Sequence, residues 1–191
     1  SIKINGYDFV DLGLPSGLLW ATCNVGADSP EDIGNYYSWG ETDTKTKYAW
    51  STYKWCRGSS NSITKYDELN CELRSEDDVA AVIWGGTWRM PTKKEVDELS
   101  LNCRWQATTQ NGTKGILIVG KNNRSIFLPF SGWYSGSSSK NVGKSGGIWS
   151  KTNGWSVIHN AVSLVFDSSS HKSGHSDRSQ GFPVRPVAPN K

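Results

Sequence analysis

The amino-acid sequence predicts a single domain of the α+β class, with two helices, short antiparallel strands and long loops. Two segments carry a helix-capping pattern followed by apolar residues, and several short apolar runs are separated by turn residues. A chain of 191 residues has a size that one domain accommodates. Ten Trp and seven Tyr stand beside a single Met. This balance is typical of loop-rich β proteins, in which large aromatic side chains fill a modest core.

The first part of the chain predicts a strand pair followed by a long loop. Residues 7–27 form two short apolar runs on either side of a Pro-Ser-Gly turn. Residues 28–70 are irregular, with many Trp and Tyr spaced by Ser, Thr, Gly and Lys. We therefore expect a loop region with its own aromatic packing.

The two helices are expected at 75–84 and 92–102. The first begins with the capping-box pattern Ser-Glu-Asp-Asp and ends before a Gly-Gly pair. The second has Thr92 as N-cap and Glu95 at the third helical position, with an apolar stripe after them.

Short strands separated by turn residues follow the helices. They are expected at Gly115–Val119, Ser125–Leu128, Ala161–Phe166 and Phe182–Val187. We expect the N- and C-terminal strands to lie close together.

Residues 131–180 differ in composition from the rest of the chain, with fifteen Ser and seven Gly. Such a bias is common in disordered linkers. Against that reading, the segment contains several aromatic residues, and the closing strand follows it. We therefore expect ordered, ligand-binding loops at about 131–180, carried by a framework of about 1–130 and 181–187.

The four cysteines permit disulfides but do not require them. Cys23, Cys56, Cys71 and Cys103 allow three pairings, and the sequence cannot choose between them. No Cys-x-x-Cys occurs, and all three His lie after the last Cys. These spacings do not fit a zinc site, and we predict neither a metal nor a cofactor.

Charge and hydropathy exclude two classes of partner. The formal net charge is +3, and the basic residues are scattered rather than clustered, so we expect no nucleic acid. No apolar stretch approaches the ~20 residues that cross a bilayer, so we expect no direct membrane insertion of this domain. Because the chain begins at Ser1 without Met, we expect any export signal or anchor to lie outside it.

Several blocks of sequence, spread over nearly the whole chain, carry a family resemblance. They are VDLGLPSGLLWATCNVGA at 10–27, YYSWGET at 36–42, YKWC at 53–56, WGGTWRMPTKKEVDEL at 84–99, IFLPFSGW at 126–133, IWS at 148–150 and GFPVRPV at 181–187. In this order they resemble the bacterial family named the Fibrobacter succinogenes major paralogous domain.

The resemblance implies a C-type-lectin-like fold. This fold is shared with formylglycine-generating enzymes and with the variable proteins of diversity-generating retroelements, which vary positions in the C-terminal part of such a domain. The corresponding segment here is about 148–180. The resemblance also implies an adhesin or a phage or pilus receptor-binding protein, extracellular or at the cell surface, as an outer-membrane-anchored lipoprotein, on a pilus or on a virion. Its partner would be a surface protein or glycan of a host or bacterial cell.

The residue inventory predicts no enzyme and no catalytic residue. No Glu follows Glu98, and Asp167 and Asp177 are isolated in a Ser-rich stretch, so paired carboxylates for glycoside hydrolysis are not marked. No Gly-x-Ser-x-Gly elbow accompanies the Ser and His residues of the second half. The alternative is an extracellular formylglycine-generating-type enzyme or a degenerate relative. The resemblance requires late active-site cysteines for that activity, and none follows Cys103.

A calcium-bridged sugar site is not predicted either. The lectin motifs Glu-Pro-Asn, Gln-Pro-Asp and Trp-Asn-Asp are all missing from the sequence. Calcium takes six to eight oxygen ligands, several of them carboxylates, and only two side-chain carboxylates, Asp167 and Asp177, follow Glu98.

The ligand site is expected on the loops and strand between the two framework blocks, where apolar, aromatic and hydrogen-bonding residues are mixed. Strand alternation adds Ser163 and Val165, because Val162, Leu164 and Phe166 are expected to face the core. The candidate contacts are Ile148, Lys151, Trp155, Val157, Ile158, His159, Asn160, Ser163, Val165, His171, His175, Ser176, Asp177 and Gln180. The alternative for Val157 and Ile158 is that they continue the strand and face inward. Trp133, Trp149 and Arg185 are expected to be framework residues.

Overall fold

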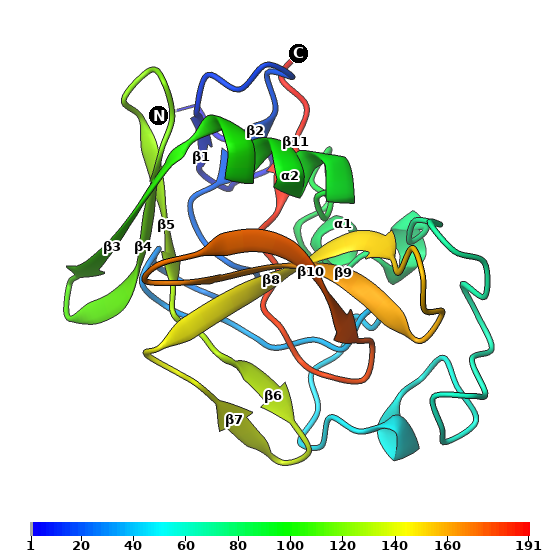
Figure 1. Cartoon of the computed structure of the whole chain (residues 1–191). Coiled ribbons are helices and arrows are strands. Elements are labelled where there is room, and N and C mark those ends of the chain that lie inside the picture. Colours follow the sequence, from blue (N-terminus) through cyan, green and yellow to red (C-terminus); the bar gives the residue numbers. More distant parts are fainter. Residues whose placement is uncertain (1) are drawn as a thin grey trace.

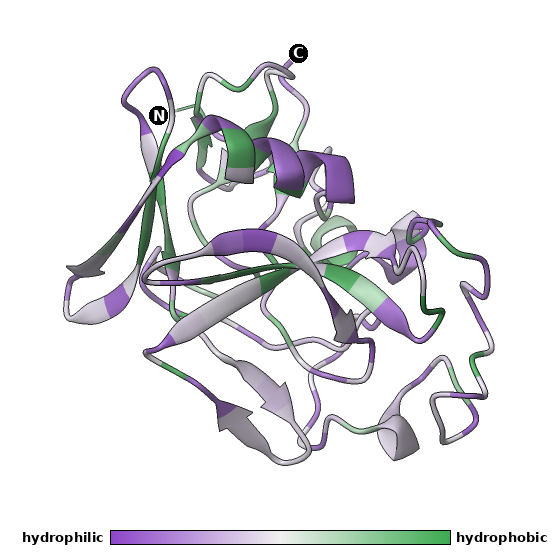
Figure 2. Ribbon diagram, viewed as in Figure 1, coloured by the Kyte–Doolittle hydropathy of each residue, from purple (hydrophilic) through white to green (hydrophobic). Residues whose placement is uncertain are grey.

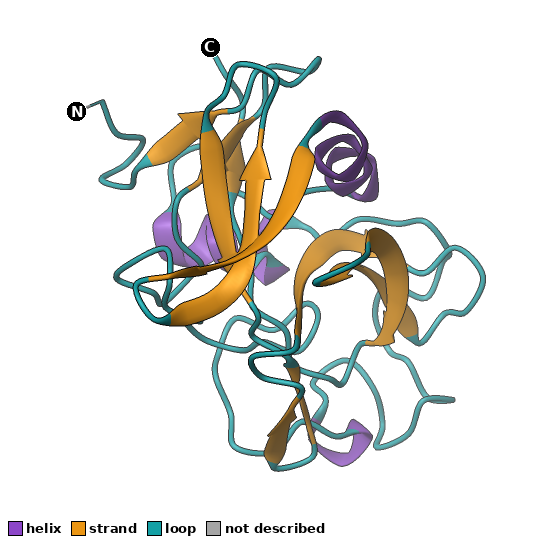
Figure 3. Cartoon of the chain, turned by 60° about the vertical axis from the view of Figure 1, so that its left-hand side comes forward, coloured by secondary structure: helices purple, strands orange, loops and turns teal. Residues whose placement is uncertain are grey.

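The computed structural model describes residues 2–191 and shows an α+β arrangement that is mostly β (Figure 1). The described chain has two α-helices, α1 (Val79–Trp84) and α2 (Lys93–Asn102). It also has two short 3-10 helices, η1 (Trp50–Thr52) and η2 (Ser75–Asp77). Its strands form several small antiparallel sheets (Figure 3).

The two ends of the chain meet in one sheet, as the sequence predicts. Its strands are β1 (Phe9–Asp11), β2 (Leu19–Ala21) and β11 (Val187–Ala188), in the order β1-β2-β11. The predicted closing strand at Phe182–Val187 is wrong in its extent. Pro183 and Pro186 lack a backbone N–H and cannot continue a hydrogen-bonded ladder, so the segment forms only isolated bridges before β11.

A three-stranded meander follows α2. Its strands are β3 (Arg104–Gln110), β4 (Thr113–Val119) and β5 (Ser125–Pro129). β3 and β4 are joined by Asn111 and Gly112, both with positive φ (46° and 81°). A two-residue Asn-Gly turn with this geometry matches the twist of a hairpin. The sequence analysis predicted β4 and β5 and missed β3.

The Ser-rich segment 131–180 is largely β structure, which corrects the expectation of loops. It contains the small hairpin β6 (Trp133–Ser135) and β7 (Ser138–Lys140). It also contains the sheet β10-β9-β8, with β8 (Ser145–Asn153), β9 (Asn160–Asp167) and β10 (His171–Asp177). The many Ser residues hid these strands because they weaken the apolar alternation by which strands are recognised.

The sheet β10-β9-β8 separates two groups of core side chains. On one face, Leu164 and Phe166 pack with Val96 and Leu99 of α2. On the other face, Trp149 packs with other aromatic residues that include Phe182. Because β9 is the central strand and both of its faces are covered, it reads as an almost continuous apolar run (Figure 2).

The two helices differ in how closely their observed bounds match the bounds predicted from the sequence. α2 is confirmed, because the Thr92 hydroxyl accepts a hydrogen bond from the Glu95 amide (3.2 Å) and the Glu95 carboxylate accepts one from the Thr92 amide (2.8 Å). The first helix begins four residues later than predicted. Ser75–Asp77 forms a 3-10 turn, and the buried Asp78 is the N-cap, accepting from the Ala81 amide at 3.1 Å.

Arg185 is a framework residue, as predicted. Its guanidinium is fully buried and donates to the Asn24 side chain (2.8 Å) and to the carbonyls of Ala21 (3.2 Å) and Phe127 (2.9 Å). These bonds join the terminal sheet to β5. Burial lowers the pKa of Arg185 to about 10, which leaves it charged at neutral pH.

Candidate functional site

The loop between β8 and β9 lies at the end of the sheet opposite the β9–β10 turn (Figure 1). This loop carries exposed apolar side chains. Trp155 is 41% exposed and Val157 is 36% exposed, and Trp155 is the most exposed tryptophan of residues 2–191. The Trp155 ring lies 3.6 Å from the ring of His175 on β10, centroid to centroid. Lys93, the first residue of α2, places its ammonium 5.1 Å from the Trp155 ring centre.

A second aromatic–histidine contact lies at the same end of the sheet. The ring of Trp50, in η1, meets the ring of His159 edge to face at 5.8 Å. The imidazole Nε2 of His159 is 3.8 Å from the Asp177 carboxylate. Asp177 and His175 are two positions apart on β10 and therefore project from the same face.

We call this set the Trp155 surface. Its members share one end of the sheet and are joined by the contacts just described: Trp50, Lys93, Trp155, His159, His175 and Asp177. It combines flat aromatic rings, the Lys93 ammonium and titratable His and Asp side chains, a mixture that is common in protein recognition sites.

Two buried polar side chains hold the loops around the Trp155 surface. Arg178 is fully buried and donates to the carbonyls of Lys65 (3.1 Å), Tyr66 (2.6 Å) and Asn160 (3.4 Å). Asn153 is also buried, accepts from the Cys71 amide (2.8 Å) and donates to the Tyr66 carbonyl. The long 65–72 segment is therefore fixed against the β8–β9 loop by hydrogen bonds that the solvent cannot easily replace.

The electrostatics of the surface favour a neutral His175. Burial lowers the pKa of His175, and the nearby Lys93 cation lowers it further. The Nε2 atom of His175 is buried without a hydrogen-bond partner among the described residues. Lys93 itself forms an ion pair with Asp97 at 2.6 Å, so its charge is partly compensated from within α2.

Two of the predicted contacts are not on the surface. Ile148 is 1% exposed and packs in the core beside α2, and Ser163 is fully buried with its hydroxyl 2.9 Å from that of Ser176. Both were placed on a ligand-binding face, and the structure corrects this. The alternation of β9 was predicted in the right register, but its second face is covered as well.

Some of the remaining predicted contacts belong to the Trp155 surface, and others are their neighbours in the chain. Trp155, His159, His175 and Asp177 come together as described above. Their exposed or half-buried neighbours in the chain are Lys151, Val157, Ile158, Asn160 and Gln180.

Three predicted contacts lie elsewhere. His171 stacks on Trp105 at 4.2 Å and is bonded to the Ser100 hydroxyl at 2.8 Å, at the far end of β10. Val165 and Ser176 project from the opposite face of the sheet, because they pair with Lys172 and Ala161 respectively. Neither group belongs to the Trp155 surface.

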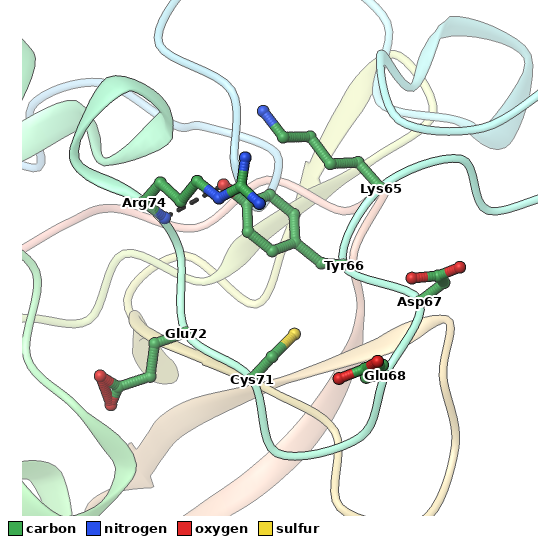
Figure 4. A pocket seen from close by; sticks show the side chains of 7 residues that line it. All are labelled: Lys65, Tyr66, Asp67, Glu68, Cys71, Glu72 and Arg74. Atoms are coloured by element: carbon green, nitrogen blue, oxygen red, sulfur yellow. Dashed lines mark hydrogen bonds between the residues drawn. The ribbon is translucent and has the colours of Figure 1, made fainter.

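A polar hollow of about 290 Å³ adjoins the β8–β9 loop. Its lining consists of Lys65, Tyr66, Asp67, Glu68, Cys71, Glu72 and Arg74 (Figure 4). Within the same segment, Leu69 is 46% exposed, and the next residue, Asn70, donates its amide to the Gly154 carbonyl at 3.2 Å. The backbone beside the exposed Leu69 is therefore hydrogen-bonded to the β8–β9 loop.

Residues 2–191 offer little support for a site of nucleophilic catalysis or for a metal-binding site. Ser100 and His171 form a hydroxyl–imidazole pair, but no carboxylate orients the imidazole in this part of the chain. The four cysteines are unpaired thiols, and burial raises the pKa of both Cys71 and Cys103. The described residues contain no group of three or more metal-ligating side chains of the His, Cys, Asp and Glu types. They also contain no helix long and apolar enough to cross a membrane.

Sequence reasoning missed three residues of this region: Trp50, Lys93 and Leu69. Trp50 lies in the aromatic loop region, which the composition did mark, but nothing in the sequence connects it to His159. Lys93 is separated from Trp155 in the sequence by the rest of α2 and by β3 to β8. A Lys in the first turn of a helix is electrostatically unfavourable, and this was the one available signal that the residue has another role.

No protein-family profile, no curated protein and no solved structure matches this chain.

Proposed function

We propose that this chain is a ligand-recognition module that binds a partner through the Trp155 surface. The observation that carries the proposal is the exposed Trp155 ring, which contacts the His175 ring and lies near the Lys93 ammonium. Aromatic residues placed this way supply a large contact area at low entropic cost. The buried Arg178 and Asn153 reduce that cost further, because the loops are already ordered before binding.

The fold that this proposal assumes is C-type-lectin-like. Its support is the set of sequence blocks that resembles the Fibrobacter succinogenes major paralogous domain. The paired terminal strands and the small antiparallel sheets beside two helices are compatible with it. The same resemblance suggests an extracellular or surface-displayed protein whose partner is a surface protein or glycan of a host or bacterial cell.

The proposal extends to the source of the ligand-binding residues. The 148–180 segment would be the variable region of a diversity-generating retroelement. Sequencing the neighbouring DNA tests this extension. A reverse transcriptase gene beside an imperfect repeat of codons 148–180, differing only at adenines, supports it, and the lack of both contradicts it.

No observation favours the alternative that the chain is a formylglycine-generating-type enzyme. Thiol chemistry of the formylglycine-generating type needs a reactive thiolate, and a raised pKa keeps Cys71 and Cys103 in the neutral thiol form. The hollow that contains Cys71 is lined mainly by charged side chains rather than by a nucleophile and its base (Figure 4).

The test of the proposed function is binding of the labelled protein to intact cells and to immobilised glycans. A panel of bacterial and epithelial cells is measured by flow cytometry, and the Trp155→Ala variant is measured beside the unaltered protein. Leu101→Ala is the matched control, because Leu101 is 82% exposed on α2 and its truncation removes no packing. Binding that is lost with Trp155→Ala and kept with Leu101→Ala supports the proposal. Equal binding by all three proteins contradicts it.

A further inference from the structure

A second cavity lies at the other end of the β8–β9–β10 sheet, on the face opposite α2. It has a volume of about 330 Å³, within the range of about 300–1,000 Å³ that small-molecule sites occupy. Its lining is made of Trp133, Ser145, Gly146, Val165, Phe166, Asp167, Ser170, Lys172 and Phe182. We call it the Trp133 cavity.

The position of this cavity follows from strand pairing. Ser145 pairs with Asp167, and Val165 pairs with both Gly147 and Lys172, so these side chains project from one face near the β9–β10 turn. The β6–β7 hairpin, which carries Trp133, lies beside this end of the sheet (Figure 1). Asn160 and Asp167, at the two ends of β9, are separated by roughly 23 Å at ~3.3 Å per residue. The Trp133 cavity is therefore distinct from the Trp155 surface.

The apolar wall of the cavity contains aromatic rings that are held in place by neighbouring aromatic rings. The half-buried Trp133 ring lies nearly parallel to the ring of Phe182, with 6.5 Å between the centroids and 24° between the planes. Phe182 is in turn held edge to face by the fully buried Trp149 at 4.8 Å. An added Cβ at Gly147 would lie 2.6 Å from the Phe182 ring, so glycine at this position permits the ring to lie against β8.

The polar rim of the cavity carries two unpaired charges. One oxygen of the Asp167 carboxylate accepts bonds from the Ser169 and Ser170 amides (both 2.8 Å), and these bonds lower the pKa of Asp167. Its other oxygen, Oδ2, has no hydrogen-bond partner among residues 2–191, and Asp167 forms no ion pair there. The exposed Lys172 also forms no ion pair in the described chain.

We propose that the Trp133 cavity binds a neutral pyranose sugar without a metal ion. A pyranose has an apolar C–H face that can lie against Trp133, and hydroxyl groups that both donate and accept. Those hydroxyls can donate to the free oxygen of Asp167 and accept from the ammonium of Lys172. The opposite charges of these two residues cancel, so a neutral ligand brings no unmatched charge into the cavity. A single carboxylate lines the cavity, which is too few for a calcium-bridged sugar.

The experiment measures binding of free glucose, galactose, mannose, N-acetylglucosamine and fucose by saturation-transfer NMR, with and without EDTA. Dissociation constants are then measured by calorimetry. The expected result is EDTA-insensitive binding of at least one sugar, weakened about tenfold by Asp167→Asn and by Lys172→Met, because each removes a hydrogen bond to a charged group. Asp167→Asn keeps the oxygen that accepts from the Ser169 and Ser170 amides, so the turn is retained.

The controls are Asp8→Asn and Lys121→Met, which change exposed residues outside both proposed sites and should leave sugar binding unchanged. The inference is overturned if no sugar binds, if EDTA abolishes binding, or if Asp167→Asn binds as well as the unaltered protein. Binding of a free zwitterionic amino acid in place of sugars would also overturn the ligand class. These outcomes are independent of the Trp155 surface, whose own test uses cell binding of Trp155→Ala.

Discussion

The ring of Trp155, in the loop between β8 and β9, lies against the ring of His175 on β10 at 3.6 Å between centroids. This contact fixes the position of the exposed indole without burying it. Because the two rings are in contact, the electrostatic environment of the indole depends on whether the imidazole is protonated.

The first prediction concerns the titration of His175. Its pKa in the folded protein should lie below the ordinary value of 6.5, because the ring is partly buried and Lys93 is near. Histidine NMR signals recorded against pH measure it, with His175→Gln identifying the resonance. Lys93→Met should raise this pKa, since it removes the neighbouring cation. The acidic groups on α2 and β10, which are Glu95, Asp97, Glu98 and Asp177, remain in both proteins. A His175 pKa at or above 6.5 would contradict this view of the surface.

The lowered pKa of His175 also makes the free energy of unfolding depend on pH, and the sign of this dependence can be stated. Between the ordinary value of 6.5 and the lower folded pKa, the unfolded chain binds more protons than the folded chain. The contribution of His175 is therefore present above this window and is lost as pH falls through it. His171 acts in the same direction, since burial lowers its pKa as well. Urea unfolding of His175→Gln and of the unaltered protein at several pH values should show a smaller acid loss in the variant.

The second prediction concerns the buried guanidinium of Arg178. Arg178→Met should lower the free energy of unfolding by at least ~3 kcal/mol, because three backbone carbonyls lose a charged donor. Amide exchange should also become faster in the 65–72 segment that Arg178 holds. The control is Arg74→Met, since Arg74 is exposed, and its effect should stay within ~0.5 kcal/mol. Equal effects of the two variants would show that Arg178 does not anchor the loops.

The third prediction compares two glycines with similar positive φ. An added Cβ at Gly132 (φ 55°) would lie 1.8 Å from the Lys140 carbonyl oxygen, whereas at Gly136 (φ 62°) nothing lies within 4 Å. Gly136→Ala should cost only the backbone strain of ~1–2 kcal/mol. Gly132→Ala should cost clearly more, because the β6–β7 hairpin must shift. Thermal unfolding of both variants measures the difference, and equal costs would contradict the close approach.

The sequence predicted those parts of the fold in which local chemistry decides the structure. The capping pair Thr92 and Glu95 marks the start of α2 in both sequence and structure. The first helix was misplaced because Ser75–Asp78 matches a capping box by residue type, whereas tertiary contacts bury Asp78 and make it the N-cap. β3 could have been found from Asn111-Gly112, a strong hairpin signal.

The candidate site was only partly predictable, because it is assembled from distant segments. Within the 155–177 region Trp155 is exposed, whereas His159, His171 and His175 are half-buried. Ile148 and Ser163 were misassigned because a sequence does not show that β9 is a central strand covered on both faces. Lys93 and Trp50 reach the surface through tertiary packing alone, which residue spacing does not encode.

The most direct measurement is of binding and unfolding on the same two variants, Trp155→Ala and Ile158→Ala. Cell-binding affinity should fall by ~1–3 kcal/mol in each, the usual range for central contacts. The free energy of urea unfolding should change much less, since Trp155 is 41% exposed and Ile158 is half-buried. If Ile158→Ala instead lowers stability by the ~2–5 kcal/mol of a core truncation and Trp155→Ala leaves binding unchanged, the Trp155 surface is not a recognition site.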